Sequence, residues 1–335
     1  MEKYSKWRDP STGVAPFLMP LSPATSDLSL PSVVKFVTVP ITSALAVTRA
    51  LLVMLLLLAQ AILVEGILSP FMLYPPLYAV LSRACNASIA RMVLLVLGIV
   101  NIPVETIRLA KTGRSPPKIA FEPRKGDIIV SNSSSYVDLL YLTFRHNATF
   151  LSPVIDPSSQ KVSGWTRASL VRAIWDNATV PSNSATKGET LEEAIKNARG
   201  PAVVFPECTT SNNRALLKFP ALVSASLARI SPSTKIFVLT FKYSPPTRLT
   251  PTLTHPIPST PAYLGPLPHL YSLLSSVSVQ SFSVRRLHPS ESPKKIEWDS
   301  GLEETLASTG RLKRLGGLGW KEKEAFLEFR KLKGR

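Results

Sequence analysis

Carboxyl, hydroxyl and amide side chains gather directly after two predicted strands of this 335-residue chain. The first segment is SNSSSYVDLL at 131–140, and the second is VVFPECTTSNNRALLKF at 203–219. Ligands in α/β sheets usually bind where strands end. A carboxylate there can accept a proton, and hydroxyl or guanidinium groups can hold a phosphate. We expect the loop ending at Asp138 and the loop starting at Glu207 to meet in one pocket that opens toward a lipid-embedded face.

The spacing in these segments resembles motifs one and three of the glycerolipid (phospholipid/glycerol) acyltransferase family. The first motif of that family reads Asn-His-x-Ser-x-x-Asp, and the third reads Phe-Pro-Glu-Gly-Thr, then Arg, Thr or Cys, then Ser or Thr, then Asn. Weaker second and fourth motifs fall at Ser163–Trp165 and Phe237–Thr240. The resemblance is nearest to the fungal lysophosphatidic acid:oleoyl-CoA acyltransferase group, whose tail resembles Leu318–Phe329. The matching residues are Asn132, Ser135 and Asp138 in the first motif and Phe205, Pro206, Glu207, Thr209, Thr210, Ser211 and Asn212 in the third.

The resemblance implies an acyl-CoA-dependent acyltransferase that esterifies a lysophospholipid, converting lysophosphatidic acid to phosphatidic acid. Acyl-CoA would be the co-substrate, with no cofactor and no metal, and membrane lipids would be partners. In the family, His deprotonates the acceptor hydroxyl and Asp orients that His. The corresponding catalytic positions here are Asp138 and Ser133. The implied substrate-binding residues are Asn132, Ser135, Glu207, Thr209, Thr210, Ser211 and Arg214.

The chain departs from the family where the proton is transferred, because Ser133 replaces the His and a serine hydroxyl is no base near neutral pH. Asp138, Glu207 or a distant His could serve as the base, or the substrate's own phosphate could assist. A lipid-binding scaffold protein of the same fold, a pseudoenzyme acting in membrane traffic, is the alternative from another functional class. His146 lies eight residues after Asp138, about 12 Å along a continuous helix, which is too far for a direct contact.

Two substitutions in the third motif change its chemistry. Cys208 stands where the family has Gly. It could act as a thiol nucleophile or be a small residue that serves packing only. Thr210 stands where phosphate-binding members often carry Arg, and Arg214 or Lys218 could restore the lost charge.

Each candidate residue also has a structural interpretation. Asp138 and the serines at 133–135 could cap the helix that follows the strand. Glu207 could pair with Arg214. The remaining histidines lie in Pro-rich or polar surroundings and are expected at the surface; they are His255, His269 and His288.

Composition points to an anionic, membranous environment. The net charge is +17, and only 18% of the residues are charged, although 45% are hydrophobic. Such a surface attracts anionic lipids and CoA phosphates. No nucleic-acid-binding signature accompanies the charge, so nucleic acid is not an expected partner. Two cysteines and four histidines without paired spacing predict neither a disulfide framework nor a metal site.

The first third of the chain predicts a membrane anchor. Residues 1–32 form a disordered N-terminal arm, and 33–110 form a membrane-anchoring helix hairpin. Its first helix ends near Val64, prolines 70–76 break it, and the short apolar run 92–104 favours a re-entrant segment or a buried core helix. Arg49 within the first helix could snorkel to the head groups.

The rest of the chain predicts an acyltransferase-like α/β domain at 111–290, with a mixed, largely parallel sheet flanked by helices, as in glycerol-3-phosphate acyltransferases. A basic C-terminal tail, 291–335, carries a helix at 319–333 that could lie on the membrane or pack on the domain. The resemblance implies an endoplasmic reticulum membrane or lipid droplet location, with the catalytic domain facing the cytosol. The predicted strands are 127–131, 149–154, 202–205, 235–241 and 277–285, and the predicted helix between them is 187–199.

Overall fold

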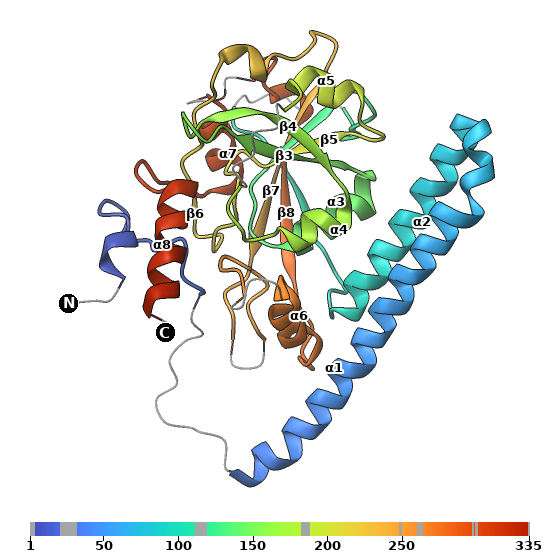
Figure 1. Cartoon of the computed structure of the whole chain (residues 1–335), viewed down its shortest axis with the longest axis vertical. Coiled ribbons are helices and arrows are strands. Elements are labelled where there is room, and N and C mark those ends of the chain that lie inside the picture. The colour runs from blue at the N-terminus through green and yellow to red at the C-terminus, as the bar shows by residue number, and fades with distance from the viewer. Residues whose placement is uncertain are drawn as a thin grey trace.

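A seven-stranded, largely parallel sheet forms the centre of the protein (Figure 1). The computed structural model describes residues 4–20, 32–110, 119–181, 188–247, 250–259, 264–296, 298 and 301–333. The strand order is β1-β8-β7-β2-β5-β3-β4, and a separate two-stranded sheet pairs β6 with β9. The predicted mixed α/β class is confirmed. The strands are β1 (Val104–Ile107), β2 (Ile128–Ser131), β3 (Thr149–Ile155), β4 (Val162–Ala168), β5 (Ala202–Val204), β6 (Ala215–Leu216), β7 (Ile236–Tyr243), β8 (Phe282–Leu287) and β9 (Lys313–Arg314).

The four central strands, β7, β2, β5 and β3, run parallel, so their carboxyl ends share one edge. β4 and β8 are antiparallel to β3 and β7, and β1 adds to β8 in parallel. β1 comes from the segment that we assigned to the hairpin. The late strand begins five residues after its predicted start, because Gln280 N donates to Gly98 O and holds the preceding residues in a loop.

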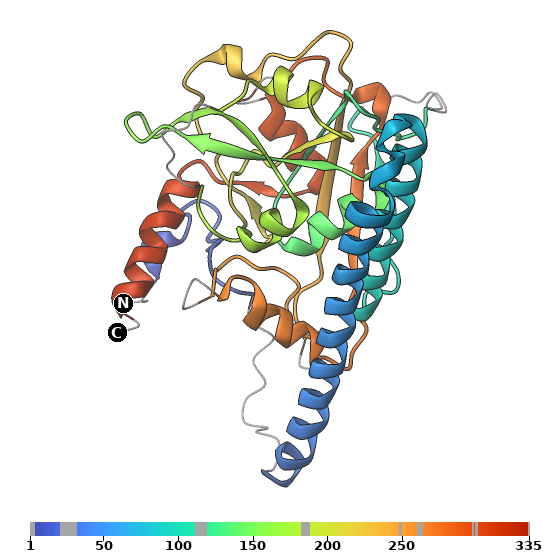
Figure 2. The ribbon, with the colours of Figure 1, turned by 45° about the vertical axis from the view of Figure 1, so that its right-hand side comes forward.

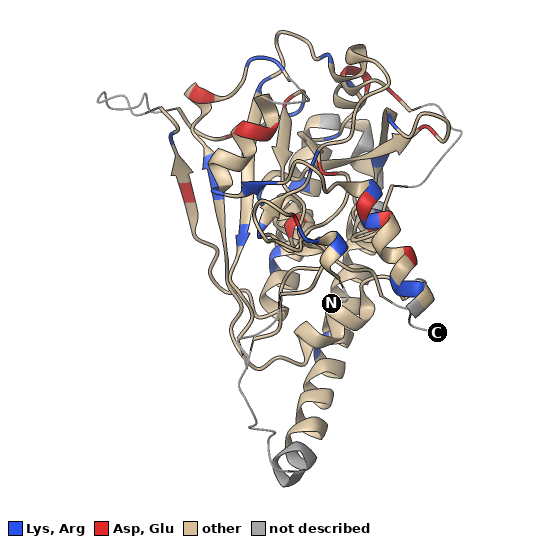
Figure 3. Ribbon diagram, turned by 90° about the vertical axis from the view of Figure 1, so that its left-hand side faces the viewer, with Lys and Arg blue, Asp and Glu red and all other residues tan. Residues whose placement is uncertain are grey.

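Two long apolar helices lie side by side along one side of the sheet (Figures 1 and 2). α1 (Ser32–Gln60) continues through a π-helical turn (Ala61–Ile67) and a 3-10 turn (Ser69–Leu73) into α2 (Pro75–Val96). Both are long and apolar enough to cross a membrane. In Figure 3, α1 is the more visible helix of the hairpin, and it carries few charged residues.

The second half of the hairpin differs from the sequence-based expectation. α2 begins at the prolines and ends at Val96, and the left-handed Gly98 then turns the chain toward β1. The apolar run 92–104 is therefore half helix and half connection. Polar residues such as Arg91 interrupt the apolar pattern, so the sequence did not indicate where the helix starts. Arg91 donates hydrogen bonds to Ile99 O and Val100 O.

The side chain of Arg49 in α1 binds the domain, whereas the sequence suggested that it extends to the lipid head groups. Its Nη1 donates to Leu274 O at 3.0 Å and to Ser276 O at 2.7 Å. These carbonyls lie at the C-terminal end of α6 (Leu267–Leu274), where a cation is favourable. Ser43 of α1 also lies 3.0 Å from the Tyr271 hydroxyl of the same helix. The hairpin is thus attached to the domain along α1.

The sheet is covered on both faces. α2 and α3 (Tyr136–His146) cover one face, with α1 and α6 outside them. α5 (Leu191–Lys196) and α7 (Gly301–Gly310) cover the other. α5 is shorter than the predicted helix and starts at a capping box of Thr190 and Glu193, and part of that prediction lies outside the described residues. The short α4 (Leu170–Trp175) packs on α3 and β3.

The two ends of the chain pack on each other. α8 (Trp320–Lys333) presents Phe326 to Trp7 and Phe17, whose ring centroids lie 5.4 and 5.7 Å away. Residues 4–20 are therefore an ordered part of the fold, contrary to the predicted disordered arm, while 21–31 lie outside the described residues. The C-terminal helix was predicted either to lie on the membrane or to pack on the domain, and the structure shows that it packs on the domain.

Candidate functional site

The first motif loop is built around Asp138. Ser135 and Asp138 form a capping box at the start of α3. Asp138 Oδ2 accepts hydrogen bonds from Ser134 N at 2.9 Å and Ser135 N at 3.0 Å, and Tyr243 of β7 donates its hydroxyl proton to Oδ1. The capping interpretation of Asp138 is confirmed, because these donors fix the loop that follows β2.

The third motif loop is joined directly to the first. Glu207 Oε2 accepts from Ser133 N at 2.9 Å, and Glu207 Oε1 accepts from Leu217 N at 2.9 Å. Ser211 N donates to Ser133 O at 3.1 Å. The two loops therefore meet, as the sequence predicted. Arg214 is exposed and forms no ion pair with Glu207.

Two asparagines attach these loops to β7. Asn132 accepts from Phe241 N at 2.8 Å and donates to Phe241 O at 3.2 Å. Asn213 donates to Ser134 Oγ at 2.8 Å and accepts from Tyr243 N at 3.0 Å. Asn213 follows the third motif and was not predicted as a site residue, although its position beside Asn212 was the available signal. Such side-chain bridges fix both loops relative to the sheet.

The weaker motifs lie in strands. Ser163–Trp165 belong to β4, where Trp165 is fully buried, and Phe237–Thr240 belong to β7. They contribute core residues and strand pairing to the frame that carries the two loops.

Burial dominates the electrostatics of both carboxyl groups. It raises the pKa of Asp138 to about 7 and the pKa of Glu207 to about 8, although the backbone N–H donors lower both values. Both side chains are almost completely buried. Burial therefore disfavours the charged form of each carboxyl group, and both groups hold the geometry of the loops.

A cavity of about 100 Å³ opens beside the joined loops. Neither Asp138 nor Glu207 is among the residues that line it. Ser133, Thr209 and Thr210 do line it, and the hydroxyl groups of both threonines form hydrogen bonds within the protein. α4 and the segment after it form the opposite wall. The lining residues are Ser133, Leu139, Phe150, Leu151, Ser152, Pro153, Ala173, Asp176, Asn177, Ala178, Thr179, Phe205, Cys208, Thr209 and Thr210.

A buried lysine reaches the third motif from the C-terminal helix. Lys323 of α8 is completely buried, and its Nζ donates to Thr209 Oγ1 at 2.7 Å, Thr210 O at 2.8 Å and Thr210 Oγ1 at 3.2 Å. Arg214 and Lys218, the expected replacements, are both exposed. The sequence signal was the resemblance of the tail around Lys323, which did not reveal that the tail returns to this loop.

Histidines expected at the surface are buried. His255 and His269 stack with ring centroids 4.8 Å apart, and Tyr136 OH lies 3.1 Å from His269 Nδ1. His255 N donates to Ser134 O, and His255 Nδ1 lies 3.3 Å from Oδ1 of Asn177, which lines the cavity. Burial lowers the pKa of His255 to about 3 and that of His269 to about 4. The surface prediction also fails for His288, which is buried after β8.

Cys208 adopts the left-handed conformation that explains glycine at this position in the family. Its φ is +57°, and its thiol lies 3.5 Å from Pro206 O. Burial raises the pKa of the thiol, which disfavours the nucleophilic thiolate.

The fold and the joined motif loops define a mixed α/β chain whose motif segments resemble those of acyltransferases. A protein of Schizosaccharomyces pombe named "Putative lysophosphatidic acid:oleoyl-CoA acyltransferase" is 29% identical over 341 residues, which cover 99% of each chain. This full-length similarity supports the relationship that the two motifs predicted. No family model and no solved structure matches the chain.

Proposed function

We propose that the protein is an acyl-CoA-dependent acyltransferase that esterifies lysophosphatidic acid to phosphatidic acid, with the glycerol-3-phosphate acyltransferase-like fold of its resemblance. The observation that carries this proposal is the junction of the two motif loops. The hydrogen bond from Ser133 N to Glu207 joins the loops, and Ser133, Thr209 and Thr210 from the two loops line one cavity. The name of the Schizosaccharomyces pombe relative supports the substrate class.

The reaction moves one acyl group and one proton. The acceptor hydroxyl attacks the thioester carbonyl, the new ester bond forms, and the carbon–sulfur bond breaks to release CoA, which receives the proton as its thiol. A group must first accept that proton. Ser133 does not suit this role by its chemistry, and the oxygens of Asp138 and Glu207 already accept the hydrogen bonds that hold the loops.

His255 is the proton acceptor to test first. Its ring hydrogen-bonds to Asn177, a cavity-lining side chain, and its main chain is bonded to the first motif loop. At a pKa of about 3 the imidazole is neutral but only a weak base at pH 7, so this role requires an anionic substrate nearby that raises the pKa. Replacing His255 with Asn should lower kcat far more than it raises KM.

The membrane part of the proposal rests on the hairpin. Most apolar side chains of the described part of α1 are exposed, including Leu51, Leu55 and Leu58. Water is a poor solvent for such a surface, and lipid is a good one. We place the protein at the endoplasmic reticulum membrane or a lipid droplet, with the domain facing the cytosol, where acyl-CoA is made.

Transfer of labelled oleate from oleoyl-CoA to lysophosphatidic acid, by the full chain in phosphatidylcholine vesicles, tests the function. Ser133→Phe fills the cavity and should abolish product, whereas Ser233→Phe in an exposed turn should not. The expected result is equal amounts of phosphatidic acid and free CoA thiol. A folded, vesicle-bound protein that forms no product would establish the scaffold alternative, which the serine at position 133 favours.

A further inference from the structure

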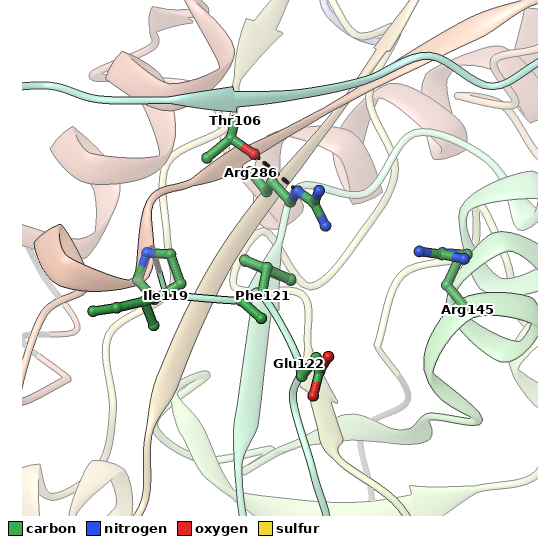
Figure 4. A pocket seen from close by; sticks show the side chains of 8 residues that line it. Thr106, Ile119, Phe121, Glu122, Arg145 and Arg286 are labelled. Carbon is green, nitrogen blue, oxygen red and sulfur yellow. Dashed lines mark hydrogen bonds between the residues drawn. The ribbon is translucent and has the colours of Figure 1, made fainter. Parts of the chain in front are cut away.

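A cavity with two arginines lies outside the candidate active site (Figure 4). Its volume is about 310 Å³. The first motif loop lies at the start of α3, whereas Arg145 comes from the last turn of that helix. The cavity is therefore displaced along α3 from the motif loops, and it contains none of the predicted site residues. The lining residues are Thr106, Ile119, Ala120, Phe121, Glu122, Arg145, Arg286 and Pro289.

Both guanidinium groups are held in place by neighbours other than carboxylates. Arg286 Nε donates to Thr106 Oγ1 at 3.1 Å, and its guanidinium lies 5.4 Å from the centroid of the Phe121 ring. Arg145 lies 5.8 Å from the centroid of the Phe144 ring. Figure 4 shows the two guanidinium groups directed into the same space.

No acid neutralises this pair within the described part of the chain. The ion pairs found there include neither Arg145 nor Arg286. Glu122 also lines the cavity, but its carboxylate lies 3.6 Å from Arg124, outside the space between the two arginines. Two nearby cations raise each other's energy, so an anion between them would be stabilised.

The neighbouring His146 reports the same positive field. Burial, and then the charges of Arg145, Arg83 and Arg286, together lower its pKa to about 3. Arg83 belongs to α2, so the positive field extends from the sheet to the hairpin.

A second cavity, of about 300 Å³, shares Arg145 with the first. Its wall is mainly apolar and passes beside α2, where Met92 and Leu95 are about half exposed. A ligand reaching both cavities would therefore have an anionic end and a hydrocarbon end. The lining residues are Arg91, Val100, Asn101, Ile102, Val104, Tyr141, Phe144 and Arg145.

We propose that these two cavities form a binding site for an anionic membrane phospholipid, separate from the active site. The phosphate lies between Arg145 and Arg286, since guanidinium groups bind phosphate oxygens through paired N–H donors. The acyl chain lies along Val100, Ile102 and Phe144, beside a helix that is apolar enough to be membrane-spanning. The bilayer is the source of the ligand because the apolar end borders that helix.

Photoaffinity labelling of the full chain in neutral detergent tests this site. The probe is phosphatidic acid with a diazirine in its acyl chain, and the labelled peptides are mapped by mass spectrometry. We expect labels within 99–107 and 141–146, and Arg145→Gln/Arg286→Gln should reduce them at least tenfold. The control, Arg167→Gln/Arg330→Gln, removes two exposed charges that line neither cavity, and the labels should remain.

Competition separates the lipid from a free anion. Dioctanoyl phosphatidic acid should displace the probe, while dioctanoyl phosphatidylcholine and inorganic phosphate at the same concentration should not. Labels that persist in the double variant, or equal displacement by phosphatidylcholine or by phosphate, would overturn the proposal. The single variant Arg145→Gln changes one exposed residue, so it provides the same comparison if the double variant does not fold. None of these readouts requires acyl transfer.

Discussion

Replacing Lys323 with Met should show whether a charge behind the cavity wall selects an anionic acceptor. Methionine has nearly the same length and can fill the buried space that Lys323 occupies. The Lys323 Nζ faces three oxygen acceptors, which use all three protons of an ammonium group. Burial lowers the pKa of Lys323, and the nearby Glu207 opposes that shift. The substitution removes the charge and its three hydrogen bonds together.

The expected cost in stability is modest. Thr209 Oγ1 still donates to Thr179 O, and Thr210 Oγ1 still donates to His255 O. Thr210 O loses its donor, and the buried ammonium no longer has to be desolvated. We therefore expect the free energy of unfolding to fall by about 1–2 kcal/mol.

The effect on substrate should be larger. Lys323 Nζ is 2.7 Å from Thr209 Oγ1, and Thr209 and Thr210 line the cavity. An anion touching this wall would lie about 6 Å from the charge, which corresponds to about 3 kcal/mol at an effective dielectric constant of about 20. This energy predicts a loss of about a hundredfold in kcat/KM for lysophosphatidic acid.

The assay compares two acceptors that differ in charge. Lysophosphatidic acid and monoacylglycerol are each supplied with oleoyl-CoA to wild type, Lys323→Met and the exposed control Lys331→Met. The loss should be confined to Lys323→Met and should be at least tenfold greater for lysophosphatidic acid. Equal losses for both acceptors would mean that Lys323 acts only on loop structure, and no loss would refute the electrostatic argument.

Three further outcomes are expected. Because burial raises the folded-state pKa of Asp138 to about 7, above about 3.9 in the unfolded chain, its contribution is complete below pH 4 and is lost as pH rises through 7. Measured by urea unfolding, the wild type should thus lose free energy of unfolding relative to Asp138→Asn between pH 5 and pH 8, because the buried histidines, which act in the opposite direction, are the same in both proteins; a wild-type advantage that stays constant or grows with pH would contradict this reasoning. Cys208→Ala should keep acyl transfer, since burial raises the pKa of the thiol; a folded variant without transfer would instead support an acyl-cysteine intermediate. Trp175 of α4 is 44% exposed, whereas the other four tryptophans are buried. The Trp175 ring packs on Gly265, just before α6, and α6 contacts the apolar helix α1. Brominated phospholipids should therefore quench a fluorescence component that Trp175→Phe removes; equal quenching in both proteins would place α4 away from lipid.

Much of the frame follows from local pattern. Short β-branched runs predict the four central strands because alternating burial and strand propensity act over a few neighbouring residues. The capping chemistry of Ser135 and Asp138 is local as well. The hairpin break at the prolines needs only the geometry of the proline ring. The start of α2 was missed because Arg83, Asn86 and Arg91 interrupt the apolar pattern that marks a membrane helix.

The sequence by itself determined which two loops carry the site, because parallel strands bring their carboxyl ends to one edge whatever packs around them. Only the tertiary structure decided which side chains reach the cavity. Lys323 lies 113 positions after Thr210 and arrives there because α8 folds back against the loop. His255 is buried because its main chain binds Ser134. Asp138 and Glu207 lie within the motifs, yet backbone donors turn both carboxylates away from the cavity. Such contacts depend on packing between segments distant in sequence, which no local pattern encodes.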